Sequence, residues 1–153
     1  MRFQAFRCTF HCQEKHLPEE RNENSCIIYL TIEGAQPYQH FLFMGDAGWL
    51  TEYQLMKRFP HLPVDVLVLG HHGSRYSSSY GFLQHYRPKI AWVSAGYANR
   101  YQHPSPVTQA RLSALEIPLY STIRSGSLSF QLLGSTLQMR EYRAEKKWLQ
   151  RNN

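Results

Sequence analysis

Apolar residues occur in short runs along the chain, and the spacing within each run predicts a secondary-structure element. The run 26–32 is rich in β-branched and aromatic residues, a turn follows at 34–37, and a second apolar run covers 40–44. This order predicts an antiparallel hairpin with a loop longer than two residues. The run 64–69 is almost continuously apolar, as expected of a strand buried on both faces, and 89–94 predicts a further strand.

Helical spacing marks three further segments. Apolar positions within 49–59 recur mostly every three or four residues, and Pro60 ends the pattern. A short helix is predicted at 80–86, and a longer one begins with Ser105 as N-cap and Pro106 in the first helical position. Because strands and helices alternate, the pattern predicts βαβ units within an α/β fold. The remaining predicted strands are 119–122, 127–133 and 136–142, the last two joined tightly through Gly134-Ser135.

Three of these predicted strands are followed by polar side chains that can bind metals or anions. Asp46 follows the first of the three, His71 and His72 follow the second, and a polar cluster from Asn99 to His103 follows the third. Ligand sites of open α/β sheets lie beyond the carboxyl ends of the strands. We therefore expect these side chains to form one site.

The chemistry of the first two groups leaves alternatives open. The Asp46 carboxylate suits a hard divalent ion, although Gly-Asp is also a common turn. A neutral imidazole suits manganese, zinc or iron, and the second histidine of the pair could contact phosphate or donate a proton. If strand geometry continued to His71 and His72, the two rings would point to opposite sides, and one alone would face the site.

The third group and a nearby serine suit a phosphate-containing substrate. The Arg100 guanidinium has the fork geometry that holds two phosphate oxygens. In the alternative interpretation, Asn99 and Arg100 satisfy backbone groups of a loop. Ser74 begins a Ser-rich loop without the Gly-x-Ser-x-Gly surroundings of a serine nucleophile, so it is interpreted as a loop-forming or phosphate-contacting hydroxyl.

Composition and charge narrow the class of protein. With 153 residues, 42% of them hydrophobic, the chain fits one domain with a sizeable core. Its formal net charge of +6 favours an acidic partner, such as nucleic acid or an anionic membrane surface. The alternative is that the basic residues form a solvated face without a partner. No apolar run approaches the roughly 20 residues of a membrane helix, and the first residues lack the apolar region of a signal peptide. Taken alone, the chain is expected in the cytoplasm.

The cysteines do not indicate a disulfide framework. Cys8, Cys12 and Cys26 are an odd number in a chain of this size, although a bridge between Cys8 and Cys12 stays open. The set Cys8, His11, Cys12 and His16 matches no zinc pattern of paired ligands. An edge strand followed by a loop is the preferred interpretation of this region.

Several motifs, taken together, resemble a known family. They are segments 22–28, 41–46, 65–74, 88–90 and 99–104, which read Asn-Glu-Asn-Ser-Cys-Ile-Ile, Phe-Leu-Phe-Met-Gly-Asp, Asp-Val-Leu-Val-Leu-Gly-His-His-Gly-Ser, Pro-Lys-Ile and Asn-Arg-Tyr-Gln-His-Pro. Across residues 22–133 they resemble the metallo-β-lactamase-like domain of the ComEC competence proteins. The resemblance implies an α/β fold whose mixed sheet and flanking helices form the C-terminal half of an αββα sandwich. It places this half-domain at 1–142, followed by a basic tail at 143–153.

The resemblance also implies a function. In that family the domain belongs to an inner-membrane DNA channel used in natural transformation, and it is thought to process incoming DNA as a metal-dependent nuclease. The chain is therefore expected to be a hydrolase that acts on DNA with manganese or zinc. As part of the full channel protein it would lie on the periplasmic side of the inner membrane.

Residue by residue, the resemblance assigns roles to the motifs above. Asp46 corresponds to the metal-bridging carboxylate and His72 to a late histidine ligand, with His71 as its rival. The candidate catalytic residues are His71, His103 and Arg100. The candidate substrate-binding residues are Ser74, Asn99, Arg100 and Tyr101.

One departure from the family is expected to limit catalysis. The first half of the family's fold carries a His-x-[His/Asp]-x-Asp-His cluster that supplies most of the metal ligands, and this sequence contains none. The chain is therefore interpreted as a truncated or split half-domain, whose partner would be the missing N-terminal half or the membrane channel. The alternative is a non-catalytic module that binds DNA through its basic surface, or that forms a homodimer through an exposed apolar sheet face.

Overall fold

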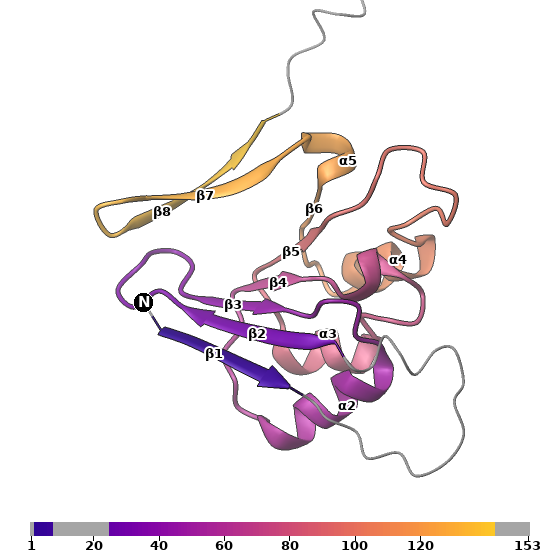
Figure 1. Cartoon of the computed structure of the whole chain (residues 1–153), viewed down its shortest axis with the longest axis horizontal. Helices are drawn as coiled ribbons and strands as arrows, with labels where there is room; N and C mark the ends of the chain where they lie inside the picture. The colour runs from indigo at the N-terminus through magenta and orange to yellow at the C-terminus, as the bar shows by residue number, and fades with distance from the viewer. Residues whose placement is uncertain (1, 8–24, 143–153) are drawn as a thin grey trace, which may run out of the picture.

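A mixed β-sheet forms the centre of the computed structural model, which describes residues 2–7 and 25–142. In this part of the chain the sheet has six strands in the order β1-β2-β3-β4-β5-β6 (Figure 1). The strands β1 to β3 are antiparallel neighbours, and β3 to β6 run parallel. Their bounds are β1 Arg2–Arg7, β2 Cys26–Thr31, β3 His40–Phe43, β4 Val66–Val68, β5 Ile90–Val93 and β6 Leu119–Ser121.

Helices cover one face of this sheet, and a hairpin lies over the other (Figure 1). The helices on the first face are α2 Trp49–Arg58, α3 Tyr80–Tyr86 and α4 Pro106–Ala114. A short helix, α5 Thr122–Ser125, leads from β6 into the hairpin of β7 Leu128–Leu133 and β8 Thr136–Glu141. The arrangement is therefore a mixed α/β fold with flanking helices.

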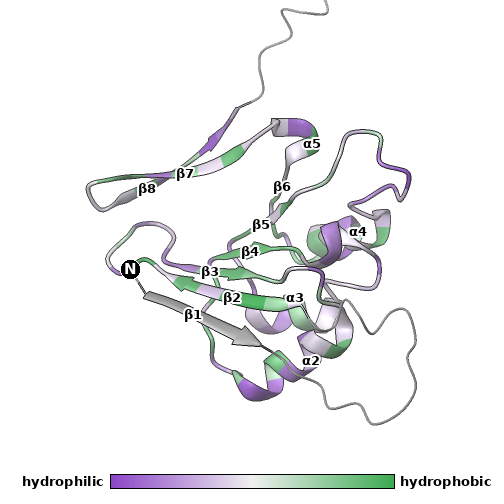
Figure 2. Ribbon diagram, viewed as in Figure 1, coloured by the Kyte–Doolittle hydropathy of each residue, from purple (hydrophilic) through white to green (hydrophobic). Residues whose placement is uncertain are grey.

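The alternation of side chains along the strands divides the core into two clusters. Leu42, Leu67 and Ala91 are paired neighbours in the sheet, are at most 1% exposed, and pack with the helices. Burying one such leucine stabilises the fold by about 1.5–3 kcal/mol. Figure 2 shows the hydrophobic residues concentrated in the central strands, as expected of strands covered on both faces.

The β7–β8 hairpin covers only part of the second face. Phe41 is buried there against Phe130 of β7, with ring centroids 5.1 Å apart, and Leu137 of β8 belongs to the same cluster. The next row across the sheet runs from Ile28, which is 40% exposed, through the partly buried Phe43. The exposed apolar face expected from the sequence is thus reduced to the first part of this row, Ile28, Phe43 and Val68, because Trp92 farther along it stacks on Phe130 of the hairpin.

Most of the predicted elements are confirmed. The hairpin of β2 and β3, the three helices on the first face and the final hairpin all lie where the pattern places them, and Ser105 caps α4 by accepting a hydrogen bond from the Thr108 amide. The edge strand near the N-terminus is β1. Helix α5 was not predicted, because four residues between two strands carry no helical period. The cysteine–histidine set at residues 8–16 and the basic tail at 143–153 lie outside the described residues.

Among the described helices, none has the length and apolar character needed to cross a membrane.

Asp65 anchors the strand ends opposite the loops that follow β3, β4 and β5. Its Oδ2 accepts hydrogen bonds from the amides of Gln39 and His40 at 2.7 and 3.0 Å, and its Oδ1 lies 2.8 Å from Lys89 Nζ. Burial by itself raises the pKa of Asp65, but the hydrogen bonds and the Lys89 charge together outweigh burial and lower it. The ionised carboxylate therefore stabilises the folded state.

We expect Asp65→Asn to lower the free energy of unfolding by about 1–2 kcal/mol at pH 7, because charge-assisted hydrogen bonds are lost. Since the folded-state pKa lies below the unfolded one, this contribution is present above the unfolded pKa and is lost as the pH falls through the folded pKa. Urea unfolding from pH 7 to about pH 3 should show the two proteins converging. The exposed Glu116→Gln serves as control, and a difference that stays constant with pH would contradict the role of Asp65.

Candidate functional site

The loops that follow β3, β4 and β5 meet at one edge of the sheet, as the positions of their polar residues predict. The His71 amide donates to the Gly45 carbonyl at 2.9 Å, and the Ser105 amide donates to the Gly73 carbonyl at 2.8 Å. The loops after β3 and β4 also pack closely beside the first of these bonds, because a Cβ built on Gly70 would lie 2.4 Å from the Ala47 carbonyl oxygen. The three segments are therefore held together by backbone contacts.

Asp46 and His72 face each other in this loop cluster. His72 Nε2 lies 3.7 Å from Asp46 Oδ1, and both side chains are about half exposed, at 57% and 52%. On the other side of the ring, His72 Nδ1 lies 2.8 Å from the Ser94 carbonyl oxygen. Because a carbonyl oxygen only accepts, Nδ1 carries a proton, and in the neutral ring Nε2 keeps the lone pair that faces the carboxylate.

The backbone at the two adjacent histidines departs from the strand. Strand β4 ends at Val68, and His71 and His72 have φ values of 46° and 54°, in the left-handed region. Strand geometry therefore does not continue to His71 and His72, and the expectation that their rings point to opposite sides does not apply. His72 lies beside Asp46, and the His71 ring has its centroid 5.9 Å from that of His103. Left-handed non-glycine residues cost about 1–2 kcal/mol each, and such strain is often found at functional sites.

Asn99 positions the backbone of His103. Its Oδ1 accepts from the His103 amide at 2.8 Å, and its Nδ2 donates to the carbonyls of His103 and Gly96 at 2.7 and 2.9 Å. These bonds agree with the alternative in which Asn99 satisfies backbone groups. Asn99 therefore fixes the loop rather than presenting a free carboxamide.

Arg100, Tyr101 and His103 are layered on the same loop. The Tyr101 ring stacks on the His103 ring at 5.7 Å, and the Arg100 guanidinium lies 4.6 Å from the Tyr101 ring centre and bonds its hydroxyl. Arg100 and Tyr101 are exposed. The guanidinium is therefore presented to solvent on an aromatic support, a position from which it can reach an anion.

His103 is kept neutral at pH 7. Its Nδ1 is buried and has no hydrogen-bond partner among the described residues. Burial, followed by the charges of His71 and His72, lowers the pKa of His103 below its ordinary value. The ring, with Tyr101 and His72, lines a cavity of about 190 Å³ that adjoins the Asp46–His72 pair.

Ser74 lies deeper than the other candidates. Its side chain is only 4% exposed, its Oγ accepts from the Tyr76 amide at 3.3 Å, and its carbonyl accepts from the Thr108 hydroxyl at 2.8 Å. This environment agrees with the loop-forming alternative. These hydrogen bonds give no support to the other alternative, in which the Ser74 hydroxyl contacts a phosphate of the substrate.

The potential metal ligands form a pair rather than a complete set. Among the described residues, no group of three or more histidine, cysteine, aspartate or glutamate side chains could hold a metal ion. Two ligand atoms of one zinc ion, each about 2.1 Å from it, lie at most about 4 Å apart. The 3.7 Å between Asp46 Oδ1 and His72 Nε2 fits this limit, whereas the His71 ring packs against His103.

Glu52 supports the site and was missed by sequence reasoning. It lies in the first turn of α2, is 1% exposed, and accepts hydrogen bonds from the amides of Ser78 and Ser79, the latter at 2.9 Å. The spacing of apolar residues in this helix predicts that a glutamate at position 52 is exposed to solvent. The only signal in the sequence is the Ser-rich loop, whose amides need acceptors once it is buried.

Comparison with known proteins gives three relatives, while no family model matches the chain. The chain is 40% identical over 121 residues to "Competence protein ComA" of Neisseria gonorrhoeae, covering 75% of this chain and 17% of the relative. It is 32% identical over 114 residues to "ComE operon protein 3" of Bacillus subtilis, covering 74% and 14%. It is 29% identical over 124 residues to "Recombination protein 2" of Haemophilus influenzae, covering 81% and 15%.

The chain thus corresponds to a segment of much longer proteins and spans between 14% and 17% of their length. One of the three is named as a competence protein, and another as a protein of the ComE operon. These relatives together support the assignment of the chain to a competence-protein family.

Proposed function

We propose that residues 25–142 form part of a metal-dependent phosphodiesterase that processes DNA during uptake by competent cells. The observation that carries this proposal is the orientation of His72, whose protonated Nδ1 is held by Ser94 so that Nε2 faces the Asp46 carboxylate at 3.7 Å. A second partner on the far nitrogen is how proteins orient a histidine that binds a metal. The named relatives support the biological setting.

The architecture supports the proposed fold family. A mixed sheet with helices on one face and a partly covered apolar opposite face is what half of a metallo-β-lactamase-like sandwich would present. In that arrangement a second sheet would lie against the row that begins at Ile28 and Phe43. The remaining metal ligands would come from outside the described residues, in a larger competence protein associated with the inner membrane.

The residues of this chain divide the work as follows. Asp46 and His72 would hold manganese or zinc, which when bound activates water and neutralises phosphate charge. Arg100 would bind the phosphate oxygens beside the 190 Å³ cavity, where its guanidinium is supported by Tyr101. Neutral His103 can accept or give up a proton there, with His71 beside it as the alternative.

Metal affinity tests the proposal directly. We expect Asp46→Asn and His72→Gln each to weaken binding of Mn²⁺ or Zn²⁺ by at least about tenfold, because each removes a ligand atom of the pair. Calorimetric titration of the purified chain would measure this, with the exposed His85→Gln as matched control. Equal affinity in all variants, or DNA cleavage by the chain that survives Asp46→Ala, would contradict the proposal.

A metal-independent DNA-binding module is the second candidate, favoured by exposed aromatic residues. Tyr97 is 82% exposed and Tyr101 62% exposed, both on the loop between β5 and α4, and Arg100 lies against Tyr101. Exposed aromatic rings beside basic side chains stack the bases of single strands. This candidate requires salt-sensitive DNA binding that a chelator and His72→Ala leave unchanged and that Tyr101→Ala weakens.

A further inference from the structure

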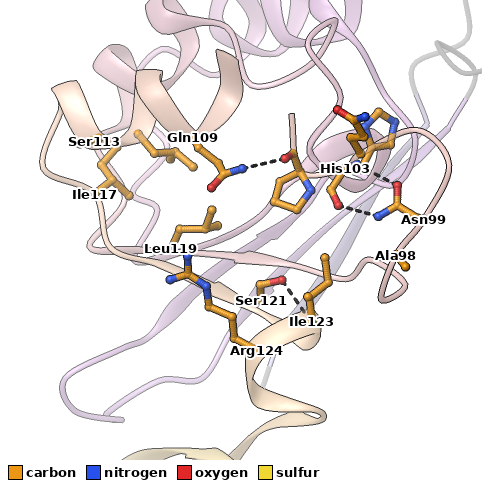
Figure 3. A pocket seen from close by; sticks show the side chains of 13 residues that line it. Ala98, Asn99, His103, Gln109, Ser113, Ile117, Leu119, Ser121, Ile123 and Arg124 are labelled. Carbon is orange, nitrogen blue, oxygen red and sulfur yellow. Dashed lines mark hydrogen bonds between the residues drawn. The ribbon is translucent and has the colours of Figure 1, made fainter. Parts of the chain in front are cut away.

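A larger cavity lies behind the loop that carries Arg100 and His103. It measures about 660 Å³, is open to solvent, and is lined by residues 98, 99 and 102–104, by helix α4 and by the segment 117–124 (Figure 3). This volume falls within the range of small-molecule sites. Asn99 and His103 line both this cavity and the smaller one beside Asp46 and His72. The two cavities therefore share one wall.

The inner wall of the larger cavity is apolar. Leu112 of α4 is 1% exposed and Ile117 is 7% exposed, and Leu119 and Ile123 continue the same surface on β6 and α5. Such a wall can bury the face of a planar ring, and the burial of its apolar area from water would favour binding.

A basic side chain also lines the cavity. The Arg124 guanidinium lies beside Leu119 (Figure 3), and among the described lining residues it is the group suited to bind a phosphate. On the opposite rim, Gln109 donates its Nε2 to the Pro104 carbonyl at 2.8 Å. That bond fixes the Gln109 carboxamide and leaves its oxygen as an acceptor for a ring amino group.

We propose that this cavity binds a nucleotide, with the base against the apolar wall and a phosphate on Arg124. An apolar wall, a fixed carboxamide and one guanidinium together match the three parts of a nucleotide better than they match a free inorganic anion, which would leave the wall unused. The proposal rests on the proposed function in one respect, namely that the shared wall would place this nucleotide next to the phosphodiester bound near Arg100.

Binding of mononucleotides to the purified chain, measured by NMR titration without divalent metal, tests the proposal. The probes are deoxyadenosine 5′-monophosphate, deoxyadenosine and inorganic phosphate. We expect the nucleotide to bind at least about tenfold more tightly than either of the other two, because it alone uses both wall and guanidinium. Shifts should concentrate in α4 and in residues 117–124.

Three variants localise the binding. Arg124→Gln should weaken nucleotide binding by about tenfold and leave deoxyadenosine unchanged, and Arg124→Lys should restore part of the loss. Ser113→Trp, at an exposed position on the rim, should block both ligands. The exposed Arg140→Gln on β8 is the matched control and should bind as the wild type does.

Inorganic phosphate binding as tightly as the nucleotide would overturn the proposal in favour of a simple anion site. Nucleotide binding that ignores both Arg124→Gln and Ser113→Trp would overturn it as well. The proposed function is tested separately by Asp46→Asn, which should weaken metal binding and leave nucleotide binding intact. Nucleotide binding in a chain that takes no metal would contradict only the proposed function.

Discussion

Replacing Glu52 with alanine is expected to lower the free energy of unfolding by about 4 kcal/mol. The Glu52 carboxylate is 1% exposed and accepts the amides of Ser78 and Ser79. Each charge-assisted hydrogen bond contributes about 1.5–3 kcal/mol, and alanine would leave both amides buried without this acceptor. The carbonyls of the same loop are held from the other side by Arg111, whose Nη1 lies 3.1 Å from the Ser77 oxygen.

Chemical denaturation at pH 7 would measure the loss. Glu52→Gln keeps one acceptor oxygen and should lose about half as much, while Glu116→Ala, at an exposed position, should change stability by less than about 0.5 kcal/mol. A loss below about 1 kcal/mol for Glu52→Ala would show that water replaces the carboxylate in the loop, contrary to the burial seen here.

Gly73→Ala is expected to lower the free energy of unfolding by about 3 kcal/mol and to displace the loop that carries His103. Gly73 has a φ of +78°, which disfavours any side chain. A Cβ there would lie 2.7 Å from Pro104 Cβ and 3.1 Å from Pro104 Cα. Both atoms belong to the proline next to His103, so relief of the contact requires the Gly73 loop and the loop between β5 and α4 to move apart.

Two glycine controls separate the causes of this loss. Gly34 has a φ of +77° and no atom within 4 Å of a built Cβ, so Gly34→Ala should cost only the backbone strain of about 1 kcal/mol. Gly81 lies exposed in α3 with equal room, and Gly81→Ala should stabilise the helix by about 0.5–1 kcal/mol. If Gly73→Ala lost no more stability than Gly34→Ala, close packing against Pro104 would not matter.

The sequence predicted the elements of this fold because their signals are local. A two-residue period, a helical period or an N-cap such as Ser105 depends on neighbours within one element, and the structure keeps these elements in place. The meeting of the polar loops at one sheet edge was also predictable. It follows from the parallel direction of β3, β4 and β5, which brings their carboxyl ends to the same side.

What the sequence did not predict depends on contacts between distant segments. The left-handed backbone at His71 and His72 arises where their loop packs against residues 45–47 and against Pro104, so the strand pattern could not foresee it. The burial of Glu52 and the cavity beside Arg124 likewise need the tertiary fold. Whether Asp46 and His72 bind a metal stays a prediction, since it concerns ligands beyond the described residues.

The partial covering of the second sheet face by the β7–β8 hairpin also depends on contacts between distant segments. The pattern predicted the β7–β8 hairpin, but its placement over Phe41 depends on ring contacts made by Phe130 and on the stacking of Phe130 on Trp92 at 4.6 Å. These contacts join residues about 40 to 90 positions apart in the chain, and no local period encodes them.

The Asp65 anchor lies at the opposite end of the parallel strands from Asp46 and His72. The hydrogen bonds of Asp65 to Gln39 and His40 fix the strand starts, whereas the loops beyond Phe43 and Val68 carry the candidate chemistry. This separation makes the molecule an adaptable scaffold. Exposed side chains in the loops can be exchanged during evolution or by design while strand registration is preserved, so new ligand preferences can arise in a chain that continues to fold.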